Sequence, residues 1–288
     1  MSVFIDYPAF FIFASLLIGL LVGSFLNVVI YRLPVMMMNS WRKEAREILE
    51  IPKPTENPVR FNLILPASTC PHCGHKISAL ENIPILSYLF LKGRCRGCKS
   101  PISIRYPLIE LLSCLLSGWI AWQLGFSIEA LLLIFLTWGL IAMSMIDIDH
   151  QLLPDSLVLP LLWLGILAHV FDYFPNITLT ESILGAVIGY LTLWIVNALF
   201  KLIRGMDGIG HGDFKLLALF GAWAGYQIIP VVILFSAAAG AIIGIISMLC
   251  FKGNNKIPYG PYLAIAGWIA LLWGQQIVTA YLEFSGIQ

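Results

Sequence analysis

Isolated carboxylates interrupt the long apolar stretches of this chain at two places. Asp213 lies in Gly210-His211-Gly212-Asp213-Phe214-Lys215, with apolar runs from Ile183 to Phe200 before it and from Leu216 to Leu234 after it. Asp147 and Asp149 close another apolar run. A carboxylate inside a bilayer costs roughly 2.5–3.5 kcal/mol on insertion scales, so both places are candidate functional sites. The flanking glycines would let a second chain segment approach closely.

Two aspartates at helix ends on the same side of a membrane indicate an aspartyl dyad. Two carboxyl groups that share one proton can activate a water molecule and protonate a leaving amine, because proximity pushes their pKa values apart. The sequence therefore predicts peptide hydrolysis by Asp147 and Asp213 without a covalent intermediate. Five further residues are predicted to support this pair: Asp149, Gly210, Gly212, Lys215 and Glu110.

Other interpretations of these acids stay open. Asp155 stands between Pro154 and Ser156, which is typical of a helix start. Glu110 lies near the start of an apolar run and could act as a partner of the helix dipole. A catalytic metal site is also conceivable, although no H-E-x-x-H spacing is present. Its ligands would come from Asp147, Asp149, His150, His211 and Asp213.

Two C-x2-C pairs lie in the largest polar region, Cys70 with Cys73 and Cys95 with Cys98. Each pair is typical of a tight knuckle, and two knuckles supply four thiolates for tetrahedral zinc. Gly74 and Gly97 are expected to give these turns their flexibility, and nearby cations favour the thiolate forms. The sequence predicts one structural zinc per chain, with redox-active dithiols as the alternative.

Composition places most of the chain in a membrane. It is 59% hydrophobic and only 11% charged, against about 25% charged residues in soluble domains. We expect an all-α polytopic membrane protein with about eight transmembrane helices and a zinc-binding loop between the first and second. The predicted spans are roughly 8–31, 106–125, 128–147, 156–172, 181–203, 214–228, 230–250 and 260–282.

Charge placement predicts the orientation. With the N-terminus outside and eight spans, all 17 Lys and Arg residues fall on one side, 12 of them between Arg32 and Arg105. The positive-inside rule makes that side cytoplasmic. The first span is then a retained anchor. We expect two domains, residues 1–105 with the anchor and zinc module and residues 106–288 with a seven-helix peptidase bundle.

Several motifs, in this order, resemble the type IV prepilin peptidases, bacterial membrane aspartyl proteases of the G-x-G-D class. These are Gly23-Ser24-Phe25-Leu26-Asn27 with Arg32-Leu33-Pro34, the paired C-x2-C motifs, Arg105-Tyr106-Pro107-Leu108-Ile109-Glu110, Asp147-Ile148-Asp149-His150 through Leu153-Pro154-Asp155, Gly210-His211-Gly212-Asp213-Phe214-Lys215 and Pro258-Tyr259-Gly260-Pro261.

The resemblance implies two activities in the bacterial inner membrane. Enzymes of this family remove the basic leader of prepilins and pseudopilins at the cytoplasmic face, and then N-methylate the new N-terminal residue with S-adenosylmethionine. The resemblance implies that the family's two catalytic aspartates correspond to Asp147 and Asp213 of this chain. The zinc loop is associated with methyl transfer. The expected partners are these substrates and the lipid bilayer, with no nucleic acid. The methyl-donor site and the oligomeric state are not predicted.

Two other classes of function stay as alternatives. Intramembrane acids could bind cations in an ion-coupled carrier, but carrier sites lie near the bilayer midplane and these acids gather at one face. Alternatively, the chain could be a scaffold subunit of a secretion machine with inert acids and a zinc loop that docks a partner.

Overall fold

The computed structural model describes residue 4 and residues 7–51, 61–250 and 258–286. Within these ranges the regular elements are helices, and the remaining pairing consists of two isolated β-bridges in the polar region. The expected all-α class is confirmed. Lys252 and Lys256, which entered the charge argument, lie outside the described residues.

The structure divides into two compact units, Met1–Ala142 and Met143–Gln288, with the division inside helix α5 (Ile128–His150). This division follows packing density alone. The functional boundary expected after residue 105 therefore stays a prediction.

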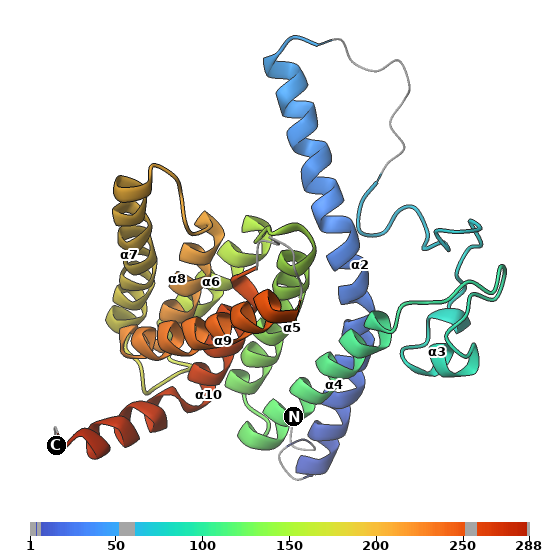
Figure 1. The fold of residues 1–288 in the computed structure, drawn as a ribbon. Coiled ribbons are helices and arrows are strands. Elements are labelled where there is room, and N and C mark those ends of the chain that lie inside the picture. The colour runs from blue at the N-terminus through green and yellow to red at the C-terminus, as the bar shows by residue number, and fades with distance from the viewer. Residues whose placement is uncertain (1–3, 5–6, 52–60, 251–257, 287–288) are drawn as a thin grey trace. The chain divides into compact units, whose positions relative to one another are not determined.

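Two helices build most of unit 1, α2 (Pro8–Ile48) and α4 (Arg105–Leu124), and they pack side by side (Figure 1). Small residues permit this contact, because a Cβ on Gly23 would lie 2.7 Å from Cα of Glu110. The polar region between them contains η1 (Leu80–Asn82) and α3 (Leu86–Phe90). At 1.5 Å per residue α2 is about 60 Å long, twice the thickness of a bilayer core. Its charge-dense end at residues 41–48 is exposed.

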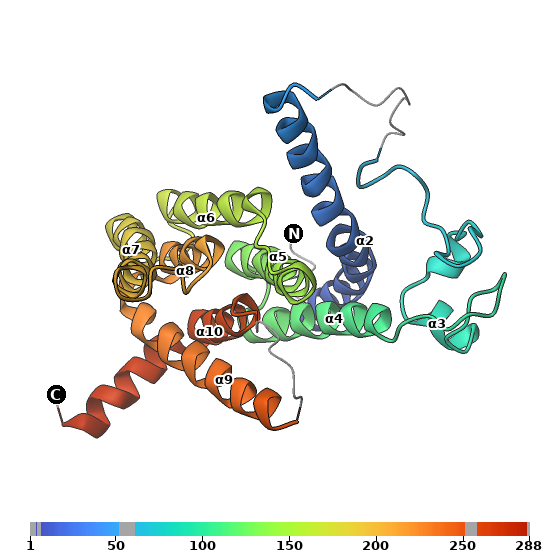
Figure 2. The same cartoon turned by 45° about the horizontal axis from the view of Figure 1, so that its top comes forward.

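Unit 2 is built around one short helix, α8 (His211–Ala224). It packs against α6 (Asp155–Val170), α7 (Leu179–Arg204), α9 (Ile229–Cys250) and α10 (Gly260–Ser285) (Figures 1 and 2). Every residue of α8 from Leu216 onwards is buried. Its backbone touches that of α7 where Gly221 meets Gly185. The short element η2 (Tyr226–Ile228) connects α8 to α9.

The expectation of about eight membrane spans was a slight overcount. Six helices in the described ranges are long and apolar enough to cross a bilayer, so the chain is a multi-pass membrane protein. The fourth and sixth predicted spans correspond to α6 and α8, of 16 and 14 residues. At 1.5 Å per residue these reach only about 24 and 21 Å, short of a core of about 30 Å. For α8 the apolar sequence reflects burial in protein rather than contact with lipid.

Candidate active site and metal centre

Asp147 lies in the last turn of α5 and is only 6% exposed. Its Oδ2 accepts a hydrogen bond of 3.0 Å from the backbone N–H of Gly260, at the start of α10. A Cβ at position 260 would lie 2.7 Å from the same oxygen. Glycine at this position therefore allows the backbone to approach the carboxylate closely enough to hold it.

Asp213 lies in the first turn of α8 and is 8% exposed. Its N–H donates to the carbonyl of Gly210 at 3.1 Å. A Cβ on Gly210 would lie 3.2 Å from Oδ2 of Asp213, so this glycine also leaves space beside a carboxylate. Leu153 contacts both Gly212, next to Asp213, and Gly260, which bonds Asp147, so the fold of unit 2 brings the two predicted catalytic acids into one neighbourhood.

Leu153 packs against glycines from both sides of this centre. A Cβ on Gly212 would lie 2.7 Å from Cβ of Leu153, and one on Gly260 would lie 3.3 Å from its Cδ2. Leu153, in the loop between α5 and α6, therefore forms an apolar wedge between the segment that carries Asp213 and the start of α10, which bonds Asp147. A larger residue at position 212 would displace this wedge.

The loop that leads into α8 is anchored by Asn197, a buried residue of α7. Its Oδ1 accepts hydrogen bonds from the N–H groups of Gly208 and Ile209 at 2.9 and 3.0 Å. Its Nδ2 donates to Asp207 at 3.0 Å, and Lys201 pairs with the same carboxylate. The Asn197 side chain thus fixes the backbone of the two residues that precede Gly210.

Other predicted residues occupy different surroundings. Asp149 is exposed, as are His150 and His211. Lys215 forms an ion pair with Asp155 at 2.7 Å and so joins the starts of α8 and α6. Glu110 belongs to unit 1, where its Oε2 accepts a hydrogen bond of 2.7 Å from the N–H of Ile85.

The four cysteines form a compact thiol cluster in unit 1. Their sulfur atoms all lie within 4.8 Å of one another. Sγ of Cys70 is 3.9 Å from that of Cys98, and Sγ of Cys73 is 4.0 Å from that of Cys95. Tetrahedral zinc with Zn–S bonds of about 2.3 Å requires sulfur separations of about 3.8 Å, so the cluster fits this metal. Among the described residues, no other group of three or more His, Cys, Asp or Glu side chains is close enough to share an ion.

The two knuckles of this cluster have matching backbones. The N–H of Cys70 bonds to the carbonyl of His75, five residues on, and that of Cys95 bonds to the carbonyl of Ser100. The residue after each second cysteine has a left-handed backbone, with φ of 69° at Gly74 and 61° at Lys99. The expected role of Gly97 in turn flexibility was therefore wrong, because Lys99 takes that conformation. A Cβ added to Gly97 would lie 3.3 Å from Sγ of Cys73, so glycine at this position leaves room for that sulfur.

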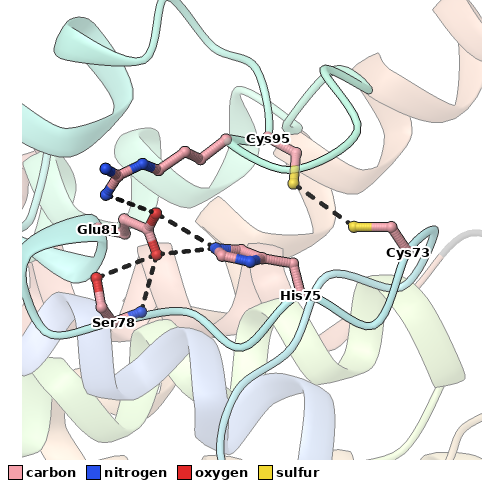
Figure 3. A network of polar contacts seen from close by, with 6 residues as sticks. Cys73, His75, Ser78, Glu81 and Cys95 are labelled. Carbon is pink, nitrogen blue, oxygen red and sulfur yellow. Dashed lines mark hydrogen bonds and ion pairs between the residues drawn. The ribbon is translucent and has the colours of Figure 1, made fainter.

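A polar network supports one side of the knuckles (Figure 3). The carboxylate of Glu81 accepts hydrogen bonds from the N–H and hydroxyl of Ser78 at 2.9 and 3.1 Å, and it contacts Nε2 of His75 at 3.2 Å. The Ser78 N–H and the His75 ring lower the pKa of Glu81 to about 2. Backbone N–H groups of His72 and Cys73 lower the pKa of the Cys70 thiol to about 6, which favours the ligating thiolate.

Comparison with known proteins establishes the family. Residues 17–124 match the bacterial peptidase A24 N-terminal domain, and residues 134–245 match the type IV leader peptidase family. A prepilin leader peptidase/N-methyltransferase of Stutzerimonas stutzeri is 56% identical over 280 residues, which cover 96% of each chain. The chain belongs to the prepilin leader peptidase/N-methyltransferase family. Relatives with the same name include one from Pseudomonas aeruginosa, 55% identical over 98% of this chain and 97% of that one, and one from Legionella pneumophila, 43% identical over 98% of both. No solved structure matches the chain.

The region that matches the N-terminal domain contains all four cysteines, and the region that matches the leader peptidase family contains both Asp147 and Asp213. Three residues that position the acids received no role from the sequence: Asn197, and Leu153 and Gly260, which lie in the motifs that carry the family resemblance. Only Asn197 carried a direct signal, because a polar amide within an apolar span is itself a candidate functional residue.

Proposed function

We propose that this chain cleaves the leader peptide of prepilins and pseudopilins and then N-methylates the new N-terminus with S-adenosylmethionine. The observation that carries the peptidase is the pair of buried carboxyls in the last turn of α5 and the first turn of α8, whose neighbouring glycines Gly260 and Gly212 both contact Leu153. The family name of its relatives supports both activities.

The two aspartates take different roles in the proposed hydrolysis. Asp147 already accepts an N–H from Gly260, and a hydrogen bond to the charged form favours that form. We assign Asp147, which this hydrogen bond orients, as the base, and Asp213 as the acid that carries the shared proton. Asp147 removes a proton from water as the oxygen attacks the scissile carbonyl carbon. Asp213 then donates its proton to the leaving nitrogen as the C–N bond breaks.

The remaining predicted residues support the dyad indirectly, through other residues. Gly210 and Gly212 give room for Asp213 and Leu153, while Lys215 orients α8 through Asp155. The exposed Asp149 and the buried Glu110 act outside the proton transfers.

Zinc is proposed as a structural ion held by Cys70, Cys73, Cys95 and Cys98. Four thiolates fill the tetrahedral shell, so this ion stabilises the loop and offers no open position for substrate. By family resemblance, the loop would serve methyl transfer, for which S-adenosylmethionine would supply the methyl group.

The proposed location is the bacterial inner membrane, with the N-terminus outside and the zinc loop and dyad in the cytoplasm. This orientation requires that the short helices α6 and α8 also carry the chain across the membrane, as the six longer helices do. All 17 Lys and Arg residues then fall on the cytoplasmic side, in agreement with the positive-inside rule. A prepilin is itself a membrane helix with a basic leader. Its scissile bond would therefore lie at the depth where α5 ends and α8 begins.

The decisive experiment incubates the full chain in membranes with a prepilin and S-adenosylmethionine, and measures leader loss and methylation separately by mass spectrometry. Asp147→Asn and Asp213→Asn should each lower cleavage by roughly 10²–10⁴-fold, the range of general acid–base contributions. Asp149→Asn should be milder and is the matched control. An essential Asp149 with a dispensable Asp147 would show that the dyad is misassigned.

A second variant separates the activities. Replacing Cys70 and Cys73 with Ser should release zinc and should impair methylation more than cleavage, because the dyad lies in the other unit. Full zinc content in this variant would refute the metal site. Lost cleavage with preserved methylation of an already processed pilin would refute the division of labour.

A further inference from the structure

The polar region between α2 and α4 contacts the membrane span α4. The N–H of Ile85, at the start of α3, donates a hydrogen bond of 2.7 Å to Oε2 of Glu110. Glu110 is five residues inside α4, one of the six apolar helices long enough to cross a bilayer. Five residues correspond to about 7.5 Å along a helix. The start of α3 therefore lies alongside the first turns of α4 and not beyond its end at Arg105.

The helix at this depth presents apolar side chains outward. Leu86, Leu89 and Phe90 are 50%, 63% and 83% exposed, although α3 has only five residues. Such a surface is costly in water but matches the boundary between headgroups and acyl chains, where interfacial helices bury their apolar side. The buried Glu110 fixes the first turn by bonding Ile85, whose backbone φ is 59°.

Cations surround the end of the same helix. An open hollow of about 520 Å³ is lined by Phe90, Leu91, Lys92, Arg94 and Lys99. Three of these five side chains are positive and none is acidic. Hydrogen bonds from the N–H of Gly93 to Tyr88 and from the N–H of Arg94 to Leu91 hold the turn that presents them.

We propose that residues 83–99 are an interfacial membrane anchor that binds the phosphate of an anionic phospholipid. Leu86, Leu89 and Phe90 enter the headgroup–acyl boundary of the leaflet on the Arg105 side. Lys92, Arg94 and Lys99 contact the lipid phosphate above them. Charge complementarity and the hydrogen bond that links the start of α3 to the span α4 favour a lipid over a protein partner. The anchor would hold the zinc module flat on the membrane.

The test uses the full zinc-loaded chain in phosphatidylcholine nanodiscs that contain a trace of photoreactive lipid. Parallel samples carry the reactive group on phosphatidylglycerol or on phosphatidylcholine, and peptide mass spectrometry maps the label. We expect label on residues 83–99 and enrichment of the phosphatidylglycerol probe there. Because a cation near an anionic surface contributes about a factor of five in binding, Lys92→Gln with Arg94→Gln should reduce that enrichment by about fivefold for each charge removed.

Matched variants keep the result interpretable. Arg42→Gln with Lys43→Gln removes the same charge from the exposed end of α2 and should leave the enrichment unchanged. Leu89→Ser with Phe90→Ser should lower labelling by both lipids, with zinc content and melting temperature confirming the fold. The anchor is refuted by labelling confined to the spans. It is also refuted by equal labelling of residues 83–99 from both lipids.

Discussion

The backbone N–H of Gly260 holds Oδ2 of Asp147 at 3.0 Å, although 113 residues separate them in the sequence. The bond ties the last turn of α5 to the first turn of α10. One carboxylate of the proposed dyad is therefore oriented before any substrate arrives. Such preorganisation lowers the cost of reaching the reacting geometry.

Gly260→Ala should disable the peptidase without unfolding unit 2. The new Cβ would lie 2.7 Å from the carboxylate oxygen and 3.3 Å from Leu153, so Asp147 must move. A displacement of about 1 Å can cost roughly 10²-fold in rate, and we expect a loss of that order in kcat for leader cleavage. Gly240→Ala is the control, because its Cβ meets only ordinary contacts, the nearest being Tyr262 at 3.6 Å. Equal rates in the two variants would contradict the role of Gly260.

Asn197→Ala should destabilise the loop that leads into α8. It removes the acceptor of the N–H groups of the exposed Gly208 and the half-buried Ile209, and each hydrogen bond contributes about 0.5–1.5 kcal/mol to stability. We expect a lower melting temperature and slower cleavage with an intact zinc site. Lys201→Gln removes only an exposed ion pair to Asp207 and should change little. If both variants cleaved at the wild-type rate, the loop anchor would play no part in positioning Asp213.

Substitutions at the two matching knuckle positions should change zinc affinity in opposite directions. Gly74→Ala places a Cβ on a residue with φ of 69°, in open space, so its effect is conformational alone. A left-handed conformation costs an L-residue about 1–2 kcal/mol. Zinc affinity should fall by about fivefold or more, because metal binding is coupled to folding of the loop. Lys99→Gly relieves the same strain at φ of 61° and should bind zinc at least as tightly. Competition with a chromophoric chelator measures both, and weaker binding by Lys99→Gly would oppose this account.

Zinc removal should spare the peptidase once the protein is folded. The dyad consists of carboxyls in unit 2, and the thiol cluster belongs to unit 1. We expect a membrane-permeant chelator to leave leader cleavage intact while it reduces methylation. Rapid loss of cleavage that added zinc restores, with the cysteine loop still folded, would support a metal held by the Asp and His side chains instead.

Local spacing made the thiol cluster predictable. Each knuckle is closed by hydrogen bonds between residues five apart, so C-x2-C alone specifies the turn, and two such turns determine the ligand set. The pairing of Asp147 with Asp213 was predictable for a different reason, because helices that end on one face of a membrane bring their polar ends to the same depth.

Longer-range relationships were beyond the reach of the sequence. The contact of Gly260 with Asp147 and the wedge formed by Leu153 depend on how helices stack, which no local spacing encodes. The overcount of spans has a similar cause. Hydropathy cannot distinguish a helix enclosed by protein, such as His211–Ala224, from one that faces lipid.

The enclosure of α8 also bears on how the protein is made. A segment of 14 residues that begins with His211, Asp213 and Lys215 is a poor candidate to leave a translocation channel for lipid by itself. Its backbone meets α7 at Gly185 and Gly221, where no side chain separates the two helices. The capping box at Thr178 and the left-handed Gly205 mark the two ends of α7. This helix is long and apolar enough to cross the bilayer by itself. Biogenesis would then release α7 and α8 together as a preassembled hairpin, so that the catalytic helix is never exposed to lipid.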